Sequence, residues 1–565
     1  MASRRSRKPS FRAKILKYLA GGVAAAKKRF DRKTGRFLAE GGGWAVTMQD
    51  VILPLALLYT ADDPANRLRG KKELLTLASR GGDALRDWQY PDGQVEFIKP
   101  DGSRWGPTYM PWTMYHWVEA YALLRDHLDP KRRRRWEKGL RLAFEGSAAQ
   151  QRRNTRIHNI PTWHAMALVR AGQVFGVDDW KELGAEKCLA AARHQHPDGY
   201  WPEGSGPTGS YNRVYVHALG LYHRFTGDEA VLDCLGRAID FHLHFTYPDG
   251  SMVETVDGRV KYHDRVGMTG LPGFGVTPEG RGLAHFLVDR ALEHSPEGAL
   301  SPHLASTWQY VPEGSEKAPP QSRRSYAAAY PQKGRRAFVR RRGPWFICLS
   351  GYLTPPRERE THAGNRWIMD RAQHVSIWHE KAGLVVGGGN SKNDPDRSTF
   401  VVWSGNRCTH VADSAELSTT KKGDVITLRY GRAACKVRVK VLGPSRIELA
   451  FSASAPARSS VTAAFGMPFK TGWTLKDSEG QAPSKVDPLR TSGEAWGEKN
   501  RPPRWFETDA YRVEVPAGSA VAWPVYPFNP YAIDGAAPPS EATARVSARL
   551  KPGRGEQRFI VRMKP

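Results

Sequence analysis

The stretch Pro197-Asp198-Gly199-Tyr200-Trp201-Pro202-Glu203-Gly204-Ser205 decides the fold, because its first three residues recur at a fixed period. Pro-Asp-Gly also stands at Pro91-Asp92-Gly93 and Pro248-Asp249-Gly250, and the first interval is about twice the second. Such a period indicates one structural unit copied along the chain. Each copy follows a helical stretch, and proline with an Asp-Gly pair ends a helix in a tight turn. The repeat predicts helical hairpins whose polar, aromatic loops gather at one end.

The first half of the chain has the hydrophobic periodicity of amphipathic helices. The predicted helices cover residues 11–30, 47–59, 72–88, 114–128, 136–144, 164–175, 180–194, 214–225, 229–245 and 281–293. A region of this length holds five or six hairpins at the observed repeat, which is the number that closes an α/α toroid. We therefore expect an α/α toroid over residues 11–300.

The pattern changes after residue 295. The stretch 311–324 is rich in proline, serine, glycine and charge, and we predict a linker or surface loop over residues 301–336. From residue 337 to residue 565, short alternating segments separated by turn signals indicate an antiparallel β-sandwich. The expected fold class is thus α+β and multidomain, with the toroid first and the sandwich second.

The composition points to an acidic partner. The 565 residues include 85 Lys and Arg against 57 Asp and Glu, a net charge of +28, and such a field attracts polyanions. No nucleic-acid-binding motif is present, so we expect no nucleic-acid partner. No apolar run has the length of a membrane span, so we expect no membrane partner. The basic runs 131–135 and 335–342 are either polyanion contacts or solvated faces.

The five cysteines and the N-terminus leave the cellular location open. The cysteines are scattered, with neither the spacing of a metal site nor that of a disulfide framework. The segment 15–26 is mildly apolar and follows a basic stretch, as in a secretory leader, but Lys17 interrupts it. We interpret 11–30 as the first helix, and both a periplasmic or secreted protein and a cytoplasmic one stay open.

Two segments, one repeat apart, carry the candidate chemistry. They are Arg156-Ile157-His158-Asn159-Ile160-Pro161-Thr162-Trp163-His164 and the stretch from Asp198 through Tyr211-Asn212-Arg213-Val214-Tyr215-Val216-His217. Both lie where a hairpin starts or turns, and a toroid places equivalent loops of neighbouring repeats side by side.

The first segment resembles the Asn-His-Gly-Thr-Trp stretch of the heparinase II/III-like and alginate-lyase-type polysaccharide lyases. The second resembles their Asp-Gly-aromatic-Glu-small-Ser…Tyr stretch, and the order of toroid and sandwich is similar as well. The sequence departs from the family at Ile160, where a histidine is frequent, and in a longer gap between Ser205 and Tyr211.

The resemblance implies an enzyme that cleaves a uronate-containing acidic polysaccharide by β-elimination. It implies Tyr211 as the catalytic phenol, and Asn159 with a histidine, either His158 or His164, at the uronate carboxylate. It also implies that His362 reaches the cleft from the sandwich. The residues we expect to contact substrate are Arg156, Trp201, Glu203, Arg213, Tyr215 and His217.

These residue types suit the reaction. The proton at C5 is weakly acidic, and neutralising the C6 carboxylate stabilises the anion formed when it leaves. A base removes this proton and an acid protonates the leaving O4. One tyrosine serves both purposes in syn elimination when a nearby cation favours its phenolate. In anti elimination a histidine is the base and the tyrosine is only the acid.

Several of the candidate residues also have a simpler, structural interpretation. Asn159 is a suitable cap for a helix that begins near Pro161. Tyr215 rivals Tyr211 as the phenol, and His164 and His217 are equally suited to a structural position in the core.

Two other functions stay open. A glycoside hydrolase on the same toroid needs two carboxylates across the cleft, for which Asp92, Asp198, Glu203 and Asp249 are available. A non-catalytic polyanion-binding protein needs neither acid nor base. We expect no cofactor, although His374, His379 and Asp370 leave a structural divalent cation in the sandwich as an alternative.

Overall fold

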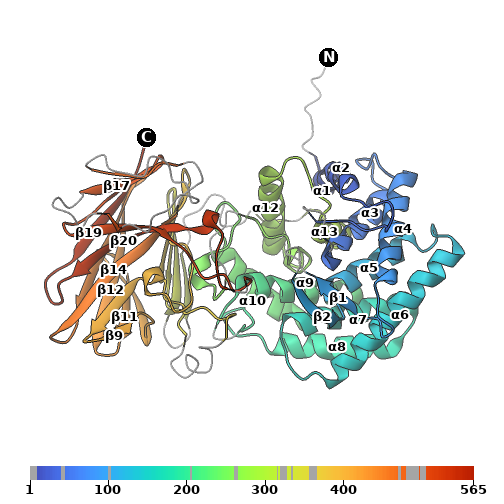
Figure 1. Cartoon of the computed structure of the whole chain (residues 1–565), viewed down its shortest axis with the longest axis horizontal. Coiled ribbons are helices and arrows are strands. Elements are labelled where there is room, and N and C mark those ends of the chain that lie inside the picture. The colour runs from blue at the N-terminus through green and yellow to red at the C-terminus, as the bar shows by residue number, and fades with distance from the viewer. Residues whose placement is uncertain are drawn as a thin grey trace, which may run out of the picture. The chain divides into compact units, whose positions relative to one another are not determined.

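The computed structural model divides the chain into two units (Figure 1). It describes residues 9–39, 43, 45–98, 103–203, 206–259, 265–314, 316–317, 327–331, 335–354, 365–468, 473–478, 495–496, 504–532 and 534–565. The helical unit comprises Met1–Gly199, Ser210–Asp240 and Val266–Pro319. The sheet unit comprises Tyr200–Gly209, Phe241–Arg265 and Pro320–Pro565. Helices lie mostly in the first half and antiparallel strands in the second, which confirms the predicted α+β class.

The predicted helices are all present in the first half of the chain. The elements there are α1 (Phe11–Gly21), α2 (Val23–Lys28), η1 (Val46–Val51), α3 (Ile52–Thr60), α4 (Lys72–Asp87), β1 (Val95–Ile98), β2 (Arg104–Thr108), α5 (Pro111–Leu124), α6 (Pro130–Arg153), α7 (Asn159–Phe175), α8 (Asp178–Arg193), α9 (Gly209–Thr226), η2 (Glu229–Val231), α10 (Leu232–His244), η3 (Glu254–Val256), α11 (Leu271–Phe274), α12 (Pro278–His294) and α13 (Pro302–Tyr310).

The three Pro-Asp-Gly copies adopt one conformation, which confirms the repeat. Gly93, Gly199 and Gly250 have φ of 87°, 88° and 89°, a left-handed conformation that glycine adopts without strain. In the first and third copies the aspartate accepts a hydrogen bond from the backbone N–H two residues on, at 3.0 and 2.8 Å. This local bond is the usual role of an aspartate in a turn.

Five helices of the helical unit form a closed inner ring and run in the same direction. In each neighbouring pair, contacts near the N-terminal ends are followed by contacts near the C-terminal ends. Asp50–His116 and Tyr59–His127 join η1 and α3 to α5 and the turn after it, and Trp112–Trp163 and Glu119–Arg170 join α5 to α7. Trp163–His217 and Arg170–Phe225 join α7 to α9. His217–His303 and Phe225–Tyr310 join α9 to α13. The ring closes because α13 also packs on α3.

The inner ring corrects the predicted domain boundary. Helix α13 lies within residues 301–336, which the composition had indicated as a linker, and it completes the ring. Ser301 accepts a hydrogen bond from the N–H of Leu304 at 3.3 Å, and Pro302 occupies the first turn, so the start of this helix is well capped. The stretch 311–324, whose composition suggested the linker, begins only after this helix.

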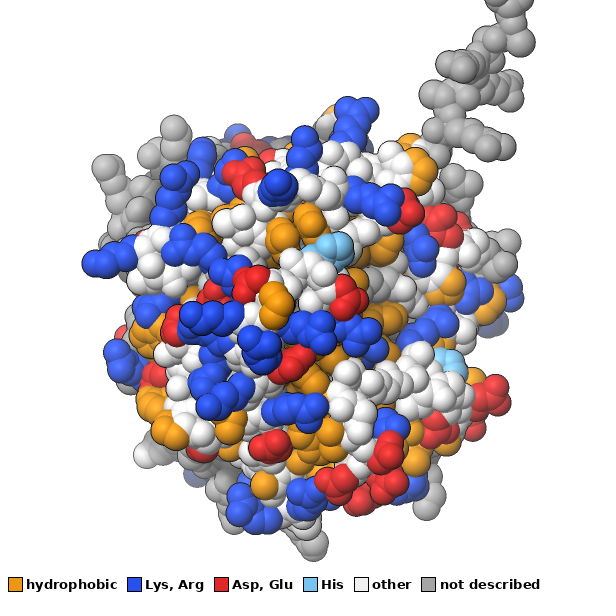
Figure 2. Space-filling model, turned by 90° about the vertical axis from the view of Figure 1, so that its right-hand side faces the viewer, with side chains coloured by type: hydrophobic (Ala, Val, Ile, Leu, Met, Phe, Trp, Pro, Cys, Tyr) orange, Lys and Arg blue, Asp and Glu red, His pale blue; other side chains and the backbone are white. Residues whose placement is uncertain are grey.

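The basic run 131–135 belongs to the solvated outer surface of the helical unit. Asp129 caps α6 and Pro130 opens it, while Arg132 is paired with Asp83 at 2.8 Å. Arg135 is paired with Asp87. On the face shown in Figure 2, Lys and Arg side chains are interspersed with Asp and Glu over the whole surface. The interpretation of this run as a solvated face is therefore the better one.

Antiparallel sheets make up the sheet unit. The five-stranded sheet has the order β3 (Ala327–Pro331), β4 (Arg335–Arg342), β5 (Trp345–Ser350), β6 (Val375–His379), β7 (Gly383–Val386). The eight-stranded sheet has the order β10 (Ser414–Thr420), β11 (Gly423–Tyr430), β12 (Ala433–Gly443), β13 (Arg446–Ser454), β21 (Gln557–Met563), β18 (Tyr511–Glu514), β17 (Trp505–Glu507), β15 (Lys476–Asp477). The six-stranded sheet has the order β16 (Ala495–Trp496), β19 (Ser519–Val525), β20 (Thr543–Leu550), β14 (Ser459–Pro468), β8 (Phe400–Ser404), β9 (Arg407–Thr409).

One apolar cluster joins these sheets. Strand β12 illustrates the pattern, because Val437 and Val439 are buried in this cluster while Lys436 and Lys440 are exposed. Burial of alternate residues is what an antiparallel sheet with one wet face requires. Within the described residues, no helix combines the length and the apolar character that a membrane crossing needs.

Candidate active site

The first halves of α7 and α9 lie side by side in a fixed register. Trp163 of α7 stacks on His217 of α9, with ring centroids 4.8 Å apart and an interplanar angle of 24°. Further along, Gln173 donates a hydrogen bond of 2.6 Å to the carbonyl of Phe225. Because both contacts join parallel helices at nearly the same sequence offset, the first turns of α7 and α9 stand level with each other.

This register supports the predicted pairing of an amide with a phenol. Asn159 lies one turn before Trp163, and the residues of α9 at the corresponding level are 211–213. One helical turn is a rise of about 5 Å. Asn159 and Tyr211 are therefore both placed at the N-terminal ends of neighbouring inner helices, where the helix dipoles favour an anion.

Asn159 is not the helix cap. The N-cap of α7 is His158, whose carbonyl accepts a bond of 3.2 Å from the N–H of Thr162, and no side chain caps the helix. The Asn159 side chain is 4% exposed and forms no hydrogen bond to any described residue. Buried amides are rarely left without a partner. The simpler interpretation of Asn159 as a cap is therefore wrong, and its amide is available to a ligand.

Tyr211 is half-buried in the first turn of α9, and Arg213 follows it in the core. Arg213 is 1% exposed, and its Nη1 donates a bond of 2.6 Å to the carbonyl of Gly267. Its Nε and Nη2 have no partner among the described residues. Burial lowers the Arg213 pKa to about 10, which leaves the guanidinium charged at neutral pH. Arg213 thus carries a positive charge that is paired with no carboxylate of the described residues, and it lies in the first turns of α9, close to the level of Asn159 and Tyr211.

A layer of aromatic rings lies beneath that level. His116, His217 and His303 surround Trp163, and the His116–His303 and His217–His303 centroids are 5.9 and 5.3 Å apart. The N–H of Gly270 donates a bond of 3.1 Å to Nδ1 of His217. Burial and the neighbouring histidines hold the pKa of His217 well below its usual value. This layer is therefore a packed floor for the site.

A buried carboxylate lies deeper in the same ring. Glu119 is fully buried and is bonded to Nε of Arg170, to the hydroxyl of Tyr310 at 2.5 Å and to Nε2 of Gln309 at 3.4 Å. The inner ring thus ties α5, α7 and α13 together by a charged network. Glu119 escaped the sequence interpretation, since a helical pattern alone does not separate a buried acid from an exposed one.

Two further tryptophans near the start of α5 were also missed. Trp105 on β2 is 59% exposed and contacts Phe97 of β1 edge-on at 5.0 Å. Trp112 is half-buried in the first turn of α5 and contacts Trp163 edge-on at 4.7 Å. Exposed indoles present large amphipathic faces to ligands. The signal was the motif Gly106-Pro107-Thr108-Tyr109, which recurs as Gly206-Pro207-Thr208 in the next copy.

The other predicted residues of the helical unit lie apart from this arrangement or within its core. His164 points to the outer helix α6, where its Nδ1 is 3.0 Å from Oγ of Ser147. Tyr215 and His217 are fully buried, which contradicts direct contact with a sugar in this conformation. Arg156 is exposed in the loop before α7, and His158 is half-buried there.

The predictions that fall in the sheet unit fare differently from one another. Trp201 is fully buried in this conformation, and its predicted contact with substrate stays a prediction. Glu203 is half-buried and its N–H donates to the carbonyl of Gly206 at 3.3 Å, as expected for a loop residue. His362 lies outside the described residues, and its predicted role stays a prediction.

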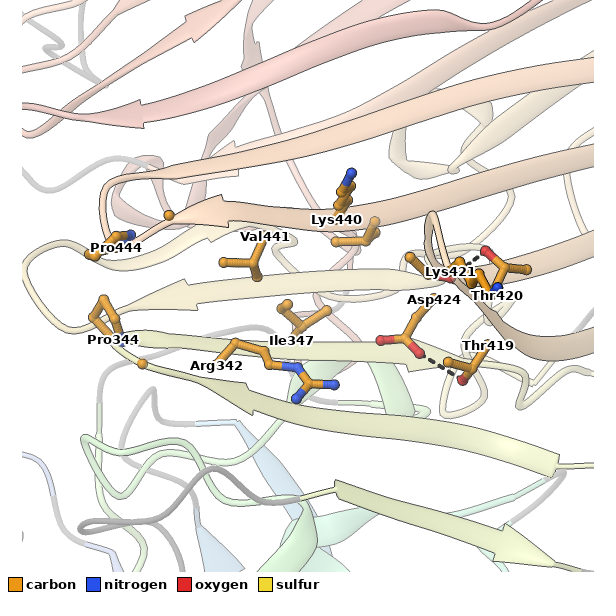
Figure 3. Close-up of a pocket in the computed structure, with 14 residues that line it drawn as sticks. Arg342, Pro344, Ile347, Thr419, Thr420, Lys421, Asp424, Lys440, Val441 and Pro444 are labelled. Atoms are coloured by element: carbon orange, nitrogen blue, oxygen red, sulfur yellow. Dashed lines mark hydrogen bonds between the residues drawn. The ribbon is translucent and has the colours of Figure 1, made fainter.

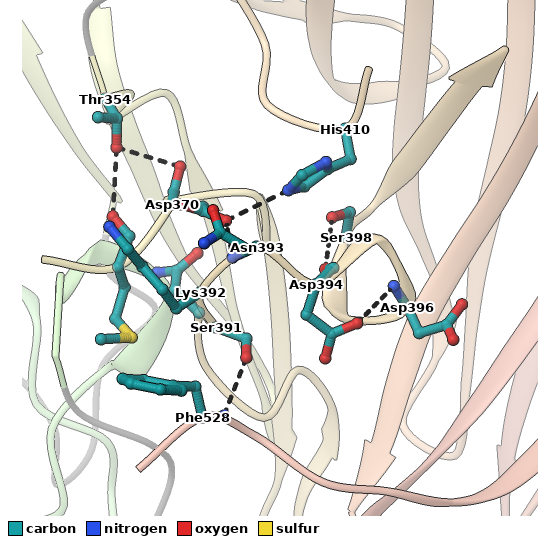
Figure 4. A network of polar contacts seen from close by, with 12 residues as sticks. Thr354, Asp370, Ser391, Lys392, Asn393, Asp394, Asp396, Ser398, His410 and Phe528 are labelled. Carbon is teal, nitrogen blue, oxygen red and sulfur yellow. Dashed lines mark hydrogen bonds and ion pairs between the residues drawn. The ribbon is translucent and has the colours of Figure 1, made fainter. Parts of the chain in front are cut away.

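The three side chains considered for a structural cation have separate partners. Asp370 lies 3.2 Å from Nε2 of His410 and accepts a bond of 2.5 Å from the N–H of Asn393 (Figure 4). Nδ1 of His374 is 2.8 Å from the carbonyl of Ser350, and His379 Nε2 is 3.0 Å from that of Pro444. Among the described residues, no three His, Cys, Asp or Glu side chains form a group that could hold a metal.

The acids considered for a hydrolase are engaged in turns. Asp92 accepts from the N–H of Gln94, and Asp249 accepts from Ser251 and from the indole N–H of Trp378 at 3.0 Å. Asp198 is 4% exposed and lies 3.6 Å from Nδ1 of His196. These contacts explain the acids structurally and do not favour a catalytic pair.

The architecture matches solved polysaccharide lyases. Heparinase III aligns with 100% of this chain and 86% of its own, at 13% identity and a TM-score of 0.53. The chondroitin AC lyase of Streptomyces coelicolor A3, solved in complex with chondroitin sulphate, aligns with 100% of this chain and 80% of its own, at 11% identity and a TM-score of 0.52. This chain therefore has the fold of the polysaccharide lyases that combine an α/α toroid with a β-sandwich. No protein-family model matches the sequence, and no curated protein matches it.

Proposed function

We propose that this protein is a polysaccharide lyase that cleaves a uronate-containing acidic polysaccharide by β-elimination. The observation that carries the proposal is the register of α7 and α9, which sets an unpartnered amide, Asn159, level with a half-buried phenol, Tyr211. The buried charge of Arg213 and the N-termini of two neighbouring parallel helices make the same place favourable for a carboxylate.

The proposed reaction proceeds on these residues. The Asn159 amide donates to the C6 carboxylate of the uronate, which spreads the negative charge that develops when C5 loses its proton. Tyr211, as phenolate, takes that proton, and the electrons of the C5–H bond form the C4=C5 double bond. The C4–O4 bond breaks, and the tyrosine hydroxyl returns a proton to the leaving O4. No water is consumed.

In the proposed reaction Arg213 acts through the electrostatic field of its positive charge. Because its guanidinium is almost fully buried, it does not touch substrate in this conformation, and it supplies a fixed positive charge in the first turns of α9. A nearby positive charge favours the phenolate over the phenol. Arg213 is therefore a positioning and electrostatic residue in this proposal.

The aromatic surface near the start of α5 suits an extended substrate. Trp105 is exposed on the β1–β2 hairpin and Trp112 is half-buried at the start of α5, so both lie near the N-terminal end of an inner helix. We propose that they stack on sugar rings on either side of the cleaved bond. The overall positive charge favours association with an acidic polymer.

A substrate panel tests the proposal. Alginate, glucuronan, heparan sulfate, chondroitin sulfate and hyaluronan are incubated with the protein, and the conjugated double bond is followed by ultraviolet absorbance. We expect absorbance to rise on at least one substrate and Tyr211→Phe to abolish the rise. Tyr59→Phe is the matched control, because Tyr59 is a half-buried phenol at the opposite, C-terminal end of α3. New reducing ends without absorbance would identify a hydrolase instead.

A further inference from the structure

The sheet unit contains an open groove of about 540 Å³ that no step of the proposed reaction uses. Its walls are the β4–β5 turn at Arg342–Pro344, the β10–β11 turn and the C-terminal end of β12 (Figure 3). The volume falls in the range of small-ligand sites, which is about 300–1,000 Å³.

The charge lining this groove is positive. Arg342, Lys421 and Lys440 all line it and are exposed, and none forms an ion pair with a described residue. The one carboxylate in the lining, Asp424, already binds Nε of Arg340 at 3.2 Å and the hydroxyl of Thr419 at 2.8 Å. Lys440 projects from the face of β12 opposite to Val439 and Val441, so the uncompensated charges at the groove are those of Arg342 and Lys421.

The groove is held open by contacts at both ends. At one end Arg340, only 9% exposed, bridges Asp424 and Thr419. At the other end the indole N–H of Trp345 donates a bond of 2.9 Å to the carbonyl of Gly443. Because the walls are strands fixed by these bonds, little of the binding free energy is lost in ordering them.

The floor indicates which ligand chemistry the groove suits. Ile347, Val439 and Val441 line it together with Pro344 and Pro444, and no aromatic side chain does. In Figure 3, Val441 and Ile347 lie between Arg342 and Lys440. A neutral sugar would find no ring on which to stack. Ile347 and Val439 are almost fully buried, so an acidic sugar chain can lay its apolar C–H faces on Val441, Pro344 and Pro444. Its carboxylate or sulfate groups then lie against Arg342 and Lys421.

We propose that this groove is a non-catalytic binding site for a segment of acidic polysaccharide, recognised through its carboxylate or sulfate groups. The proposal rests on the proposed function for the identity of the polymer. A chain held at the groove is kept near the protein between cleavage events, which raises its effective concentration at the elimination site. The groove should therefore matter for long chains and be irrelevant for chains too short to reach both sites.

The test compares two double variants made in full-length protein. The groove variant is R342A/K421A. The control variant is R134A/K138A, which removes the same numbers of lysine and arginine from the exposed, unpaired face of α6. Both variants must melt at the wild-type temperature. Binding is measured in the Tyr211→Phe background by fluorescence polarisation, with labelled decasaccharides of the five acidic polysaccharides named above.

For at least one decasaccharide, we expect the groove variant to weaken binding at least fivefold and the control variant to leave it within twofold. In active protein, we expect the groove variant to raise KM for the polymer at least threefold and to leave kcat and the KM for a tetrasaccharide unchanged. Equal losses in both variants would overturn the proposal, as would unchanged binding. Displacement by single-stranded DNA of equal charge, with the same groove dependence, would also overturn it.

The two proposals fail separately. If no substrate yields a double bond but the groove variant alone loses oligosaccharide binding, the groove stands and the lyase activity falls. If elimination is observed and the groove variant behaves like the control, the lyase activity stands and the groove falls. Carboxylated and sulfated oligosaccharides in parallel arms distinguish which anionic group Arg342 and Lys421 recognise.

Discussion

The indole of Trp163 lies on the imidazole of His217, and this stack fixes the register between two inner helices of the toroid. The ring of His217 is oriented because its Nδ1 accepts the N–H of Gly270, which places the proton of the neutral ring on Nε2. The residues proposed for chemistry, Asn159 and Tyr211, lie about one to two turns further toward the N-terminal ends. Their relative position therefore depends on a contact that neither of them makes.

Truncating Trp163 should destabilise the protein and misplace the site. Trp163→Leu removes a fully buried ring, and such losses typically cost about 3 kcal/mol or more of unfolding free energy. We expect that loss in chemical denaturation, together with a fall in kcat larger than the change in KM. Trp105→Leu is the matched control, because Trp105 is 59% exposed and should change stability by less than about 0.5 kcal/mol. Equal effects of the two substitutions would contradict the central position of Trp163.

Lowering the pH from about 6.5 should reduce the stability of the helical unit at pH values where most carboxylates are still ionised. Burial, together with the nearby His158, lowers the pKa of His164 to about 4, and burial holds that of His217 well below its usual value. In the unfolded chain both take up protons near pH 6.5. Because the unfolded state then binds more protons, stability falls as pH drops from about 6.5 toward 4. For His164 alone the full loss is about 3 kcal/mol.

The measurement is a series of denaturation curves between pH 7.5 and pH 4.5. His164→Gln keeps a polar side chain near Ser147 but does not titrate, so its stability should depend less steeply on pH than that of the wild type. His294→Gln is the control, since His294 is exposed at the end of α12 and should leave the slope unchanged. A slope identical in all three proteins would exclude His164 as a source of the acid sensitivity.

The network around Glu119 should behave as a unit. Glu119→Ala leaves Arg170 without its partner in a mostly buried position, and breaking such a pair costs about 3–5 kcal/mol. Replacing both charges, as in E119L/R170M, should recover much of that loss, because no unpaired charge remains. Denaturation of the two single variants and the double variant gives the coupling energy. Additive effects would show that the two side chains do not act together.

Salt should weaken the association of substrate with enzyme. The net charge of +28 attracts an acidic polymer over a range that shortens from about 30 Å at 0.01 M salt to about 8 Å at 0.15 M. We expect KM for the polymer to rise with ionic strength while kcat changes little. Sodium chloride and potassium glutamate at equal ionic strength should give similar curves. A KM independent of salt would mean that long-range attraction plays no part.

Local pattern in the sequence was sufficient for much of the fold. The helical periodicity and the Pro-Asp-Gly turns are local properties, and Gly93, Gly199 and Gly250 adopt the left-handed conformation such turns need. Helix α13 was missed because the linker inferred from the composition of residues 311–324 was given bounds that begin at residue 301. Its assignment to the inner ring depends on contacts with distant helices, which no local signal carries.

The candidate site was predictable in residue type more than in position. Two helix starts one repeat apart indicated Asn159 and Tyr211, and the structure places them at one level. The solvent exposure of the aromatic residues was not predictable from the sequence, because Trp201 and Tyr215 are fully buried whereas Trp105 is exposed. Burial is decided by the packing of whole elements, and aromatic residues serve equally in cores and at binding surfaces.

Replacing Arg213 with an apolar side chain should keep or raise the stability of the protein and lower its activity. Its guanidinium is charged and almost fully buried without a carboxylate, so replacing it with an apolar side chain of similar length removes a desolvation penalty. We expect Arg213→Met to melt at or above the wild-type temperature and to lower kcat about 10-fold or more, which corresponds to at least about 1.4 kcal/mol of transition-state stabilisation. Arg213→Lys keeps a positive charge and should restore part of the rate. A merely structural arginine would give the opposite pattern, with lower stability and an unchanged kcat, and that outcome would remove Arg213 from the mechanism.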